Sequence, residues 1–251
     1  MNEYHPEPAF PALHMRLWLI LGWCILGTIV CSWSAGESKA AELSAVGGRF
    51  FGEVTNEFKT MTTTRYQHKT QVDRLVGSYQ YDCVGFVSYV LRQSAPQAWA
   101  SVVSVCGIRR GYFPSPPRYQ TFFAGLGGTP QPGWQGIAKV SELRPGDIVS
   151  WNHKTKTAVG HAVVIASIPS PEPGGLWVVE VYDSTASPHL DDSRSGDSRA
   201  EAMEPGGRRS GLGHGVMALI ADPVSGALIG HRWSPKAKTI IAPTAAGRPT
   251  S

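Results

Sequence analysis

The apolar and polar positions of the chain follow different patterns in its two halves. In the first half, apolar side chains recur three and four residues apart, which is typical of helices with one buried face. The clearest case covers residues 83–92 and follows Asp82, a residue type that commonly caps a helix N-terminus. Three further helices are expected, over residues 51–65, over residues 94–105 behind a capping box at Ser94–Gln97, and over residues 117–126.

The second half contains short runs of β-branched and aromatic residues, which are typical of strands. These runs lie at residues 147–151, 161–166, 177–182, 216–221 and 227–233. The spacers between them carry proline, glycine and polar residues, which favours antiparallel neighbours. A longer polar loop is expected over residues 187–213. Helices followed by an antiparallel sheet predict an α+β fold in one domain.

The N-terminal residues are expected to lie outside this fold. Residues 17–30 form an apolar run, Arg16 precedes it and small residues follow it, which is the order of a secretory signal. A retained membrane anchor and a buried helix are the alternatives. The expected organisation is a signal or anchor over residues 1–36, a linker over 37–50, the folded domain over 51–234 and a flexible tail over 235–251.

The composition supports a folded domain and excludes several other classes. Of the 251 residues, 42% are hydrophobic, which suffices for a core and argues against wholesale disorder. Only 17% are charged, which disfavours a long coiled coil, and the formal net charge of +4 is too mild to indicate nucleic-acid binding. The four cysteines are too few for a disulfide-rich scaffold.

Two cysteines remain once the expected export segment is set aside. Cys83 begins a predicted helix, where the helix dipole and free N–H groups favour a thiolate, and Gly85 permits close backbone approach. A cysteine hydrolase places its nucleophile in this way, although a buried apolar cysteine is the alternative. Cys106 lies in a stretch that favours packing, and a Cys83–Cys106 disulfide would block the nucleophile.

His161 is the natural general base for this thiol. It opens a predicted strand directly after Gly160, so its ring can lie at the end of the sheet that faces the cysteine helix. A third polar group is needed to orient the imidazole and hold its tautomer. Asp183, at the end of the next predicted strand, is the preferred candidate, and Glu180 and His189 are the alternatives.

Three motifs in this order resemble the NlpC-type papain-like cysteine peptidases of bacterial cell walls. They are Asp-Cys-Val-Gly-Phe at 82–86, Leu-Arg-Pro-Gly-Asp-Ile-Val at 143–149 and Gly-His-Ala-Val-Val-Ile at 160–165, and the resemblance covers about residues 60–190. It implies a papain-like fold, in which a cysteine at a helix N-terminus packs on a C-terminal antiparallel sheet. It also implies cleavage of amide bonds in peptidoglycan peptides.

The resemblance implies a role for individual residues of this chain. Catalysis falls to Cys83, His161 and Asp183, and substrate contacts fall to Asp82, Tyr66 and Tyr81, with Tyr79 as a further competitor for the tyrosine position. The chain departs from the family in two places. Val84 stands where the family usually has serine, and residues 184–213 are more than a minimal domain needs.

The expectation is therefore an exported thiol hydrolase that acts on peptidoglycan peptides by cysteine, histidine and aspartate catalysis. No cofactor or metal is expected, because no metal-ligand spacing recurs along the chain. The protein is expected to be a monomer that binds no nucleic acid and meets a membrane only through an uncleaved N-terminal segment. The alternatives are an inactive cell-wall binding module and an acyl or amide transferase with the same three residues.

Overall fold

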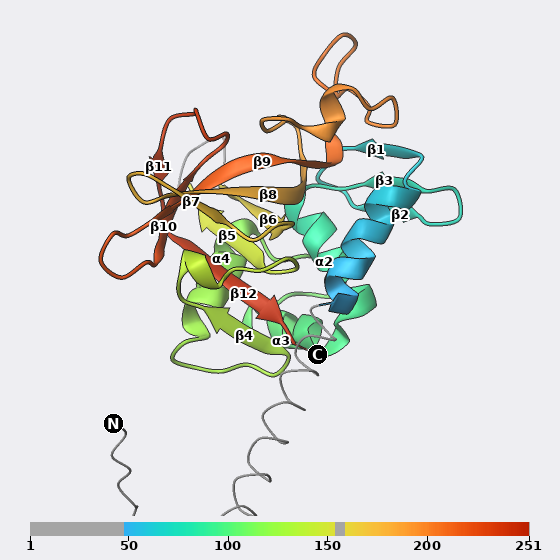
Figure 1. The fold of residues 1–251 in the computed structure, drawn as a ribbon. Coiled ribbons are helices and arrows are strands. Elements are labelled where there is room, and N and C mark those ends of the chain that lie inside the picture. Colours follow the sequence, from blue (N-terminus) through green and yellow to red (C-terminus); the bar gives the residue numbers. More distant parts are fainter. Residues whose placement is uncertain (1–47, 154–158, 251) are drawn as a thin grey trace, which may run out of the picture. The chain divides into compact units, whose positions relative to one another are not determined.

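The structure, a computed structural model, describes residues 48–153 and 159–250 (Figure 1). The chain divides into two units, Met1–Glu42 and Leu43–Ser251, and all of the described residues belong to the second. The expected signal or anchor over residues 1–36 lies outside the described residues. Within residues 48–153 and 159–250, none of the helices is long and apolar enough to cross a membrane.

An antiparallel sheet forms the larger part of the described chain. Its strands follow the order β11-β10-β9-β8-β6-β5-β12-β4, and β7 pairs with β8 outside this path. Their bounds are β4 Trp134–Ile137, β5 Ile148–Asn152, β6 Gly160–Ile165, β7 Ser170–Glu172, β8 Leu176–Thr185, β9 Gly211–Ala221, β10 Leu228–Arg232, β11 Ile240–Ile241 and β12 Thr244–Pro249. The structure is therefore α+β, as the sequence predicts.

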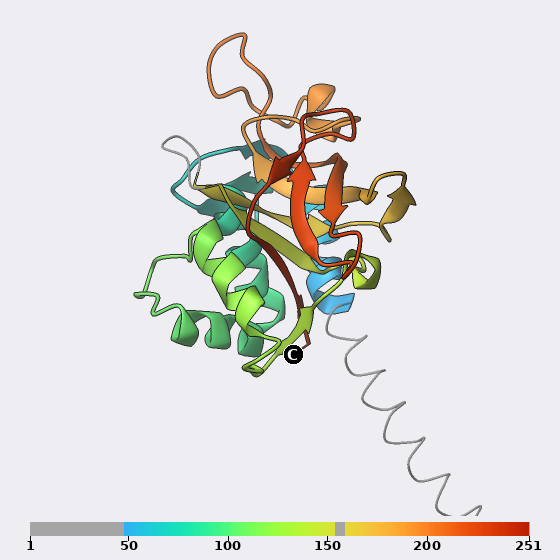
Figure 2. The same cartoon turned by 90° about the vertical axis from the view of Figure 1, so that its left-hand side faces the viewer.

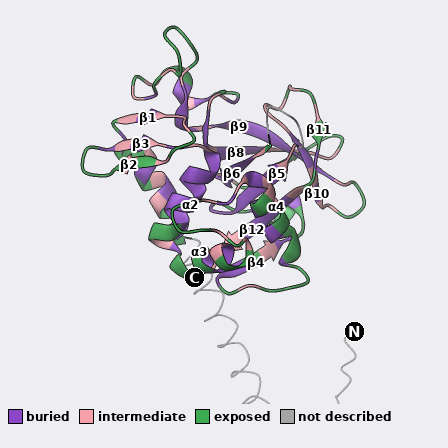
Figure 3. Ribbon diagram, turned by 180° about the vertical axis from the view of Figure 1, so that it is seen from behind, coloured by how far each residue is buried: buried purple, intermediate pink, exposed green. Residues whose placement is uncertain are grey.

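The helices precede most of this sheet in the chain, and the later ones lie together beside it, in green in Figure 2, whereas the first is blue. They cover residues 48–60, α2 Cys83–Ser94, α3 Pro96–Val105 and α4 Pro116–Gly125, with short 3-10 turns η1 Val140–Glu142 and η2 Ser193–Ser195. A small sheet of β1 Thr63–Arg65, β3 Ser78–Gln80 and β2 Gln71–Asp73 lies between the first helix and α2 in the chain. Most of α2 is buried (Figure 3).

The side-chain alternation of β6 divides the core into two clusters. Ala162 and Val164 face the helices, whereas Val163 and Ile165 face the opposite side of the sheet. That second side is also enclosed, because backbone pairing between Lys139 and Ala227 joins the two ends of the sheet. Any side chain on this inner face is therefore shielded from water over most of its length.

Two local expectations in the helical half were wrong. The first helix ends at residue 60, and the next residues form β1, because the threonine-rich run after it favours extended backbone. Ser94 does not cap α3: its hydroxyl donates to the Val90 carbonyl within α2, and Pro96 opens α3 behind Ala95. The stretch between β1 and α2, for which the sequence pattern predicts no element, contains β2 and β3.

The expected flexible tail after residue 234 was also wrong. β12 inserts between β5 and β4 and pairs with both, so the sheet is incomplete without residues 244–249. Arg248 donates to both carboxylate oxygens of buried Asp147, at 2.7 and 2.8 Å. The folded unit therefore extends to the end of β12, because a long-range ion pair and two ladders hold a segment with weak strand propensity.

Candidate active site

Cys83 is the first residue of α2 and is only 4% exposed. Asp82 caps the helix: its Oδ1 accepts a hydrogen bond of 2.8 Å from the Gly85 backbone N–H. A side chain at Gly85 would collide with Thr70, Tyr81 and Asp82, so only glycine allows this close packing. Cys83 therefore lies in the first helical turn, where free backbone N–H groups and the helix dipole interact favourably with negative charge.

His161 and Asp183 come from neighbouring strands and share the inner face of the sheet. The ladder pairs Ile165 of β6 with Val181 of β8, and alternation then places His161 and Asp183 on that same face. The His161 Nε2–H donates to Asp183 Oδ2 at 2.6 Å, and both side chains are buried. Because Nε2 is occupied, Nδ1 is the ring nitrogen left for the hydrogen bond between His161 and Cys83.

The charge on His161 is set by its two partners. Burial disfavours the imidazolium, but the Cys83 thiolate, the hydrogen bonds to Asp183 and Cys83, and the Asp183 charge outweigh it and raise the pKa of His161 to about 10. The structure thus brings together Cys83, His161 and Asp183, the three residues expected to act together. A histidine placed between a thiol and a carboxylate is the arrangement that thiol nucleophiles use.

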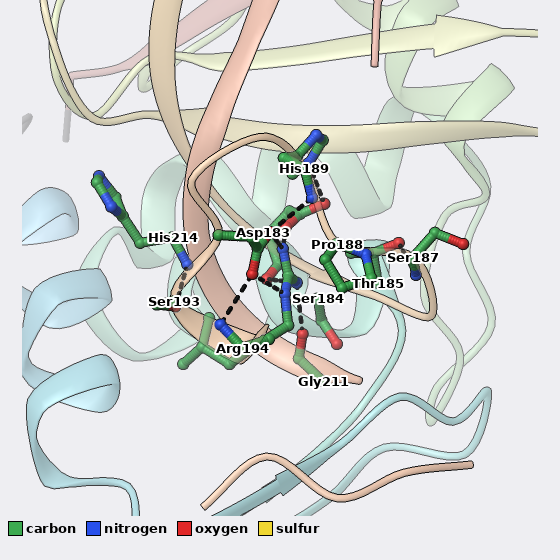
Figure 4. Close-up of polar contacts among 12 residues, drawn as sticks. Asp183, Ser184, Thr185, Ser187, Pro188, His189, Ser193, Arg194, Gly211 and His214 are labelled. Atoms are coloured by element: carbon green, nitrogen blue, oxygen red, sulfur yellow. Dashed lines mark hydrogen bonds and ion pairs between the residues drawn. The ribbon is translucent and has the colours of Figure 1, made fainter. Parts of the chain in front are cut away.

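Asp183 has two further partners that come from the segment between β8 and β9, coloured orange in Figure 1. Arg194 Nη2 donates to Asp183 Oδ1 at 2.9 Å, and His189 Nε2 lies 3.1 Å from Oδ2 (Figure 4). Burial would favour the neutral acid, but the charges of Arg194 and His189 and the hydrogen bonds of both histidines hold the pKa of Asp183 well below its usual range.

Arg194 is completely buried and every edge of its guanidinium is used. It donates to Asp192 at 2.8 Å from Nε and at 2.6 Å from Nη2. Its Nη1 donates to the Asp183 carbonyl at 3.2 Å and to the Gly211 carbonyl at 2.8 Å (Figure 4). The segment expected to be a solvated polar loop is therefore anchored against β8 and β9 by a buried cation, and β9 begins at Gly211 rather than at residue 216.

Aromatic rings cover the two imidazoles that share Asp183. The Trp233 ring stacks on His189 with ring centres 4.1 Å apart and meets His161 edge-on at 5.2 Å. The Trp151 ring, on β5, has its centre 5.4 Å from the centre of the His161 ring. Apolar walls of this kind exclude water and strengthen the charge interactions inside the cluster.

The candidate substrate contacts are placed differently from one another. The Tyr66 phenol lies close to the cluster: burial, followed by the charges of Cys83, Asp82 and Asp183, raises the pKa of this phenol. Asp82 borders Cys83, and its second oxygen pairs with His68 Nδ1 at 3.1 Å. Tyr81 does not line the site, which corrects that expectation, because its side chain is 0% exposed and donates to Glu57 Oε2 at 3.0 Å.

The remaining candidates lie outside the catalytic arrangement. Tyr79 is buried in the helical core. Glu180 points away from the inner face and contacts His214, 3.4 Å from its Nε2. In the part of the chain that the structure describes, Cys83 and Cys106 are both free thiols, so the disulfide alternative does not hold.

Sequence reasoning missed Arg194, Asp192 and Trp233 as parts of the site. Arg194 and Asp192 stand in a polar run whose composition is typical of a solvated loop, and nothing in their spacing marks burial. Trp233 ends the strand predicted over residues 227–233, and nothing in that pattern relates it to the site. The sequence contains one indirect signal: the charged segment over residues 184–213 is longer than a minimal domain of the resembled family needs.

Comparisons with protein-family models, with curated proteins and with solved structures found no match. The function therefore has to be argued from the residues of this chain.

Proposed function

We propose that this protein is a cysteine hydrolase that cleaves amide bonds, with Cys83 as nucleophile, His161 as general base and acid, and Asp183 as the group that orients His161. The observation that carries the proposal is the buried hydrogen bond of 2.6 Å between His161 and Asp183, together with the position of Cys83 next to His161, where it contributes to the raised pKa of the imidazole. A nucleophile, a base bonded to it and a third group bonded to the base are the parts that nucleophilic acyl transfer requires.

The chemistry follows from the two ring nitrogens of His161. The Cys83 thiolate attacks the amide carbonyl carbon, and the resulting oxyanion accepts a hydrogen bond from the Cys83 backbone N–H. The imidazolium Nδ1–H then protonates the leaving nitrogen, which releases the amine and leaves a thioester on Cys83. Water attacks that thioester while Nδ1 takes its proton, and the acid and the thiolate are restored.

A hollow lies near the first turn of α2, although neither Cys83 nor His161 lines it. It measures about 600 Å³ and is lined by both neighbours of the nucleophile, Asp82 and Val84, and by Lys69, Arg92 and Tyr112 among others. This volume lies in the range of small-ligand sites. Peptidoglycan stem peptides are the proposed substrates, on the strength of the motifs around Cys83 and His161 and of the papain-like arrangement that these motifs imply.

Export is part of the same proposal. A wall hydrolase has to reach the periplasm or the cell exterior, and the apolar run over residues 17–30 with its flanks matches a secretory signal or an anchor. The site needs no cofactor for the steps described, because the attacking group, the proton carrier and the oxyanion donor all come from the chain.

Digestion of purified peptidoglycan, with the products identified by mass spectrometry, tests the function. Wild-type protein and the Cys106→Ala control are expected to release peptides, and Cys83→Ala is expected to release none while retaining its fold. Equal release by Cys83→Ala would contradict the proposal. Products joined to an added amine would indicate a transferase, and an absence of products from wild type would indicate a binding module.

A further inference from the structure

His189 carries contacts on both ring nitrogens, and together they determine its protonation. Its Nδ1 lies 2.9 Å from the Trp233 backbone carbonyl oxygen. A carbonyl oxygen only accepts, so Nδ1 has to carry a hydrogen. Its Nε2 lies 3.1 Å from Asp183 Oδ2.

Asp183 cannot supply the hydrogen for that second contact. Its Oδ2 already accepts from His161 Nε2 at 2.6 Å, and its Oδ1 accepts from Arg194 at 2.9 Å. A carboxylate so surrounded by donors is ionised. Nε2 of His189 therefore has to donate, and only a ring with hydrogens on both nitrogens makes both contacts.

The charges around Asp183 balance without His161. Two carboxylates, Asp183 and Asp192, face two cations, Arg194 and the His189 imidazolium, and all four are buried. Asp192 also accepts from the His189 backbone N–H at 2.7 Å, which fixes the turn that presents the ring. The thiolate and imidazolium of Cys83 and His161 then form a second neutral pair beside the first.

A further ionisable group near His189 is His231, which lies on β10 and is 0% exposed. Burial, followed by the charges of His153, His161 and His189, lowers the pKa of His231 to about 3. His231 is thus neutral, and it supplies no charge that could replace the His189 imidazolium.

We propose that His189 is a positioning residue of the hydrolase site: as a buried imidazolium it shares the carboxylate oxygen of Asp183 with His161 and sets the charge that the Cys83–His161 pair experiences. This inference rests on the proposed function and adds a regulating group to that same site. Removing the cation from position 189 disfavours negative charge on the groups nearby, including the Cys83 thiol. The pH range in which Cys83 reacts as a thiolate is therefore expected to move upward.

The first test is spectroscopic. Full-length protein carrying ¹⁵N-labelled histidine is examined by long-range ¹H–¹⁵N correlation at pH 7, and His189→Gln identifies the His189 signals. Both His189 nitrogens are expected in the imidazolium range, whereas a pattern with one protonated and one bare nitrogen would overturn the proposal. If His189→Gln does not fold, elimination with variants of the other histidines assigns the signals.

The second test is the pH dependence of Cys83 labelling by iodoacetamide, followed at the Cys83 peptide. His189→Gln keeps a donor for Asp183 but lacks the charge, and the pH of half-maximal labelling is expected to rise by about half a unit. His214→Gln is the control, because His214 lies on β9, next to the strand that carries Asp183, and outside the cluster. Its pH of half-maximal labelling is expected to match that of wild type. Slower labelling at every pH without a shift would leave His189 only a structural role.

Neither readout needs a substrate, so the two proposals fail separately. Absence of peptidoglycan cleavage contradicts the hydrolase but leaves the His189 imidazolium standing. A neutral His189 contradicts the inference while cleavage by wild type still supports the hydrolase.

Discussion

Two buried carboxyl groups in different regions of the molecule, Asp183 and Glu57, have opposite pKa shifts. Asp183, between β6 and β9, meets Arg194 and two imidazoles, which hold its pKa well below the usual range. Glu57, on the helix over residues 48–60, meets only the Tyr81 hydroxyl, and its Oε1 has no hydrogen-bond partner among the described residues. Burial, opposed weakly by that hydroxyl, raises the pKa of Glu57 to about 8.

The difference shows that burial alone neutralises a carboxyl group and that a buried charge survives only where donors and countercharges surround it. The Asp183 region keeps its charges in the arrangement that thiol chemistry needs. The Glu57 region carries a proton instead and serves the helical core. Of these two carboxyl groups, the ionised one belongs to the candidate site and the protonated one to the helical core.

Among these variants, Asp183→Asn is expected to have the largest effect, because it removes the negative charge of the Asp183 side chain and preserves its shape. The cleavage rate of peptidoglycan fragments is expected to fall on the order of 10³- to 10⁴-fold, since the amide cannot hold the His161 tautomer as the carboxylate does. Glu180→Gln, on the same strand but the outer face, is the control and should retain activity. Equal losses in the two variants would show that Asp183 has no special role.

Arg194→Met tests whether the buried charges depend on one another. It leaves Asp183 and Asp192 without their shared cation, and the free energy of unfolding in urea is expected to fall by about 3 to 5 kcal/mol. Arg199 pairs with Asp197 at a more exposed position, so for Arg199→Met the loss of that ion pair should cost about 1 kcal/mol or less. Similar losses in the free energy of unfolding for the two variants would mean that burial does not determine how much these ion pairs stabilise the fold.

Glu57→Gln tests the opposite region through its pH dependence. Because the folded pKa lies above the unfolded one, the folded state binds the extra proton and wild-type stability falls as pH rises between the two values. Between pH 5 and pH 7 the variant should gain about 2 to 3 kcal/mol over wild type. Parallel pH profiles of the two proteins would show that Glu57 is not protonated in the fold.

His231→Phe is expected to have the smallest effect. Both ring nitrogens of His231 lack hydrogen-bond partners among the described residues, and the ring stacks on Trp151 at 4.2 Å. An apolar ring of similar shape loses no hydrogen bond there, so the stability should change by less than about 1 kcal/mol. A large loss would mean that His231 has a polar partner, such as a bound water.

Local pattern was enough to predict the helix start at which Cys83 lies. The apolar spacing after Asp82 and the capping residue itself predict the start of α2 within one residue, because helix initiation is a local event. Strand alternation likewise separates Asp183 from Glu180. These features depend on neighbours in the chain, which a sequence displays directly.

The remainder depends on contacts between distant residues. Arg194 is buried because the segment between β8 and β9 folds back on Gly211, and β12 is ordered because Arg248 reaches Asp147 across 101 positions. Tyr81 was misplaced for a similar reason, since its burial depends on the helix that carries Glu57. No spacing rule along the chain reports such pairings.

The central claim, that Cys83 is an activated nucleophile, is tested most directly by comparing the two described thiols in one reaction. Cys83 is 4% exposed, whereas Cys106 is half-buried and its thiol pKa is raised by burial. Iodoacetamide at pH 7 and peptide-level mass spectrometry give the two labelling rates. The account predicts that Cys83 reacts at least about tenfold faster despite its burial, and faster labelling of Cys106, as exposure alone would dictate, would contradict it.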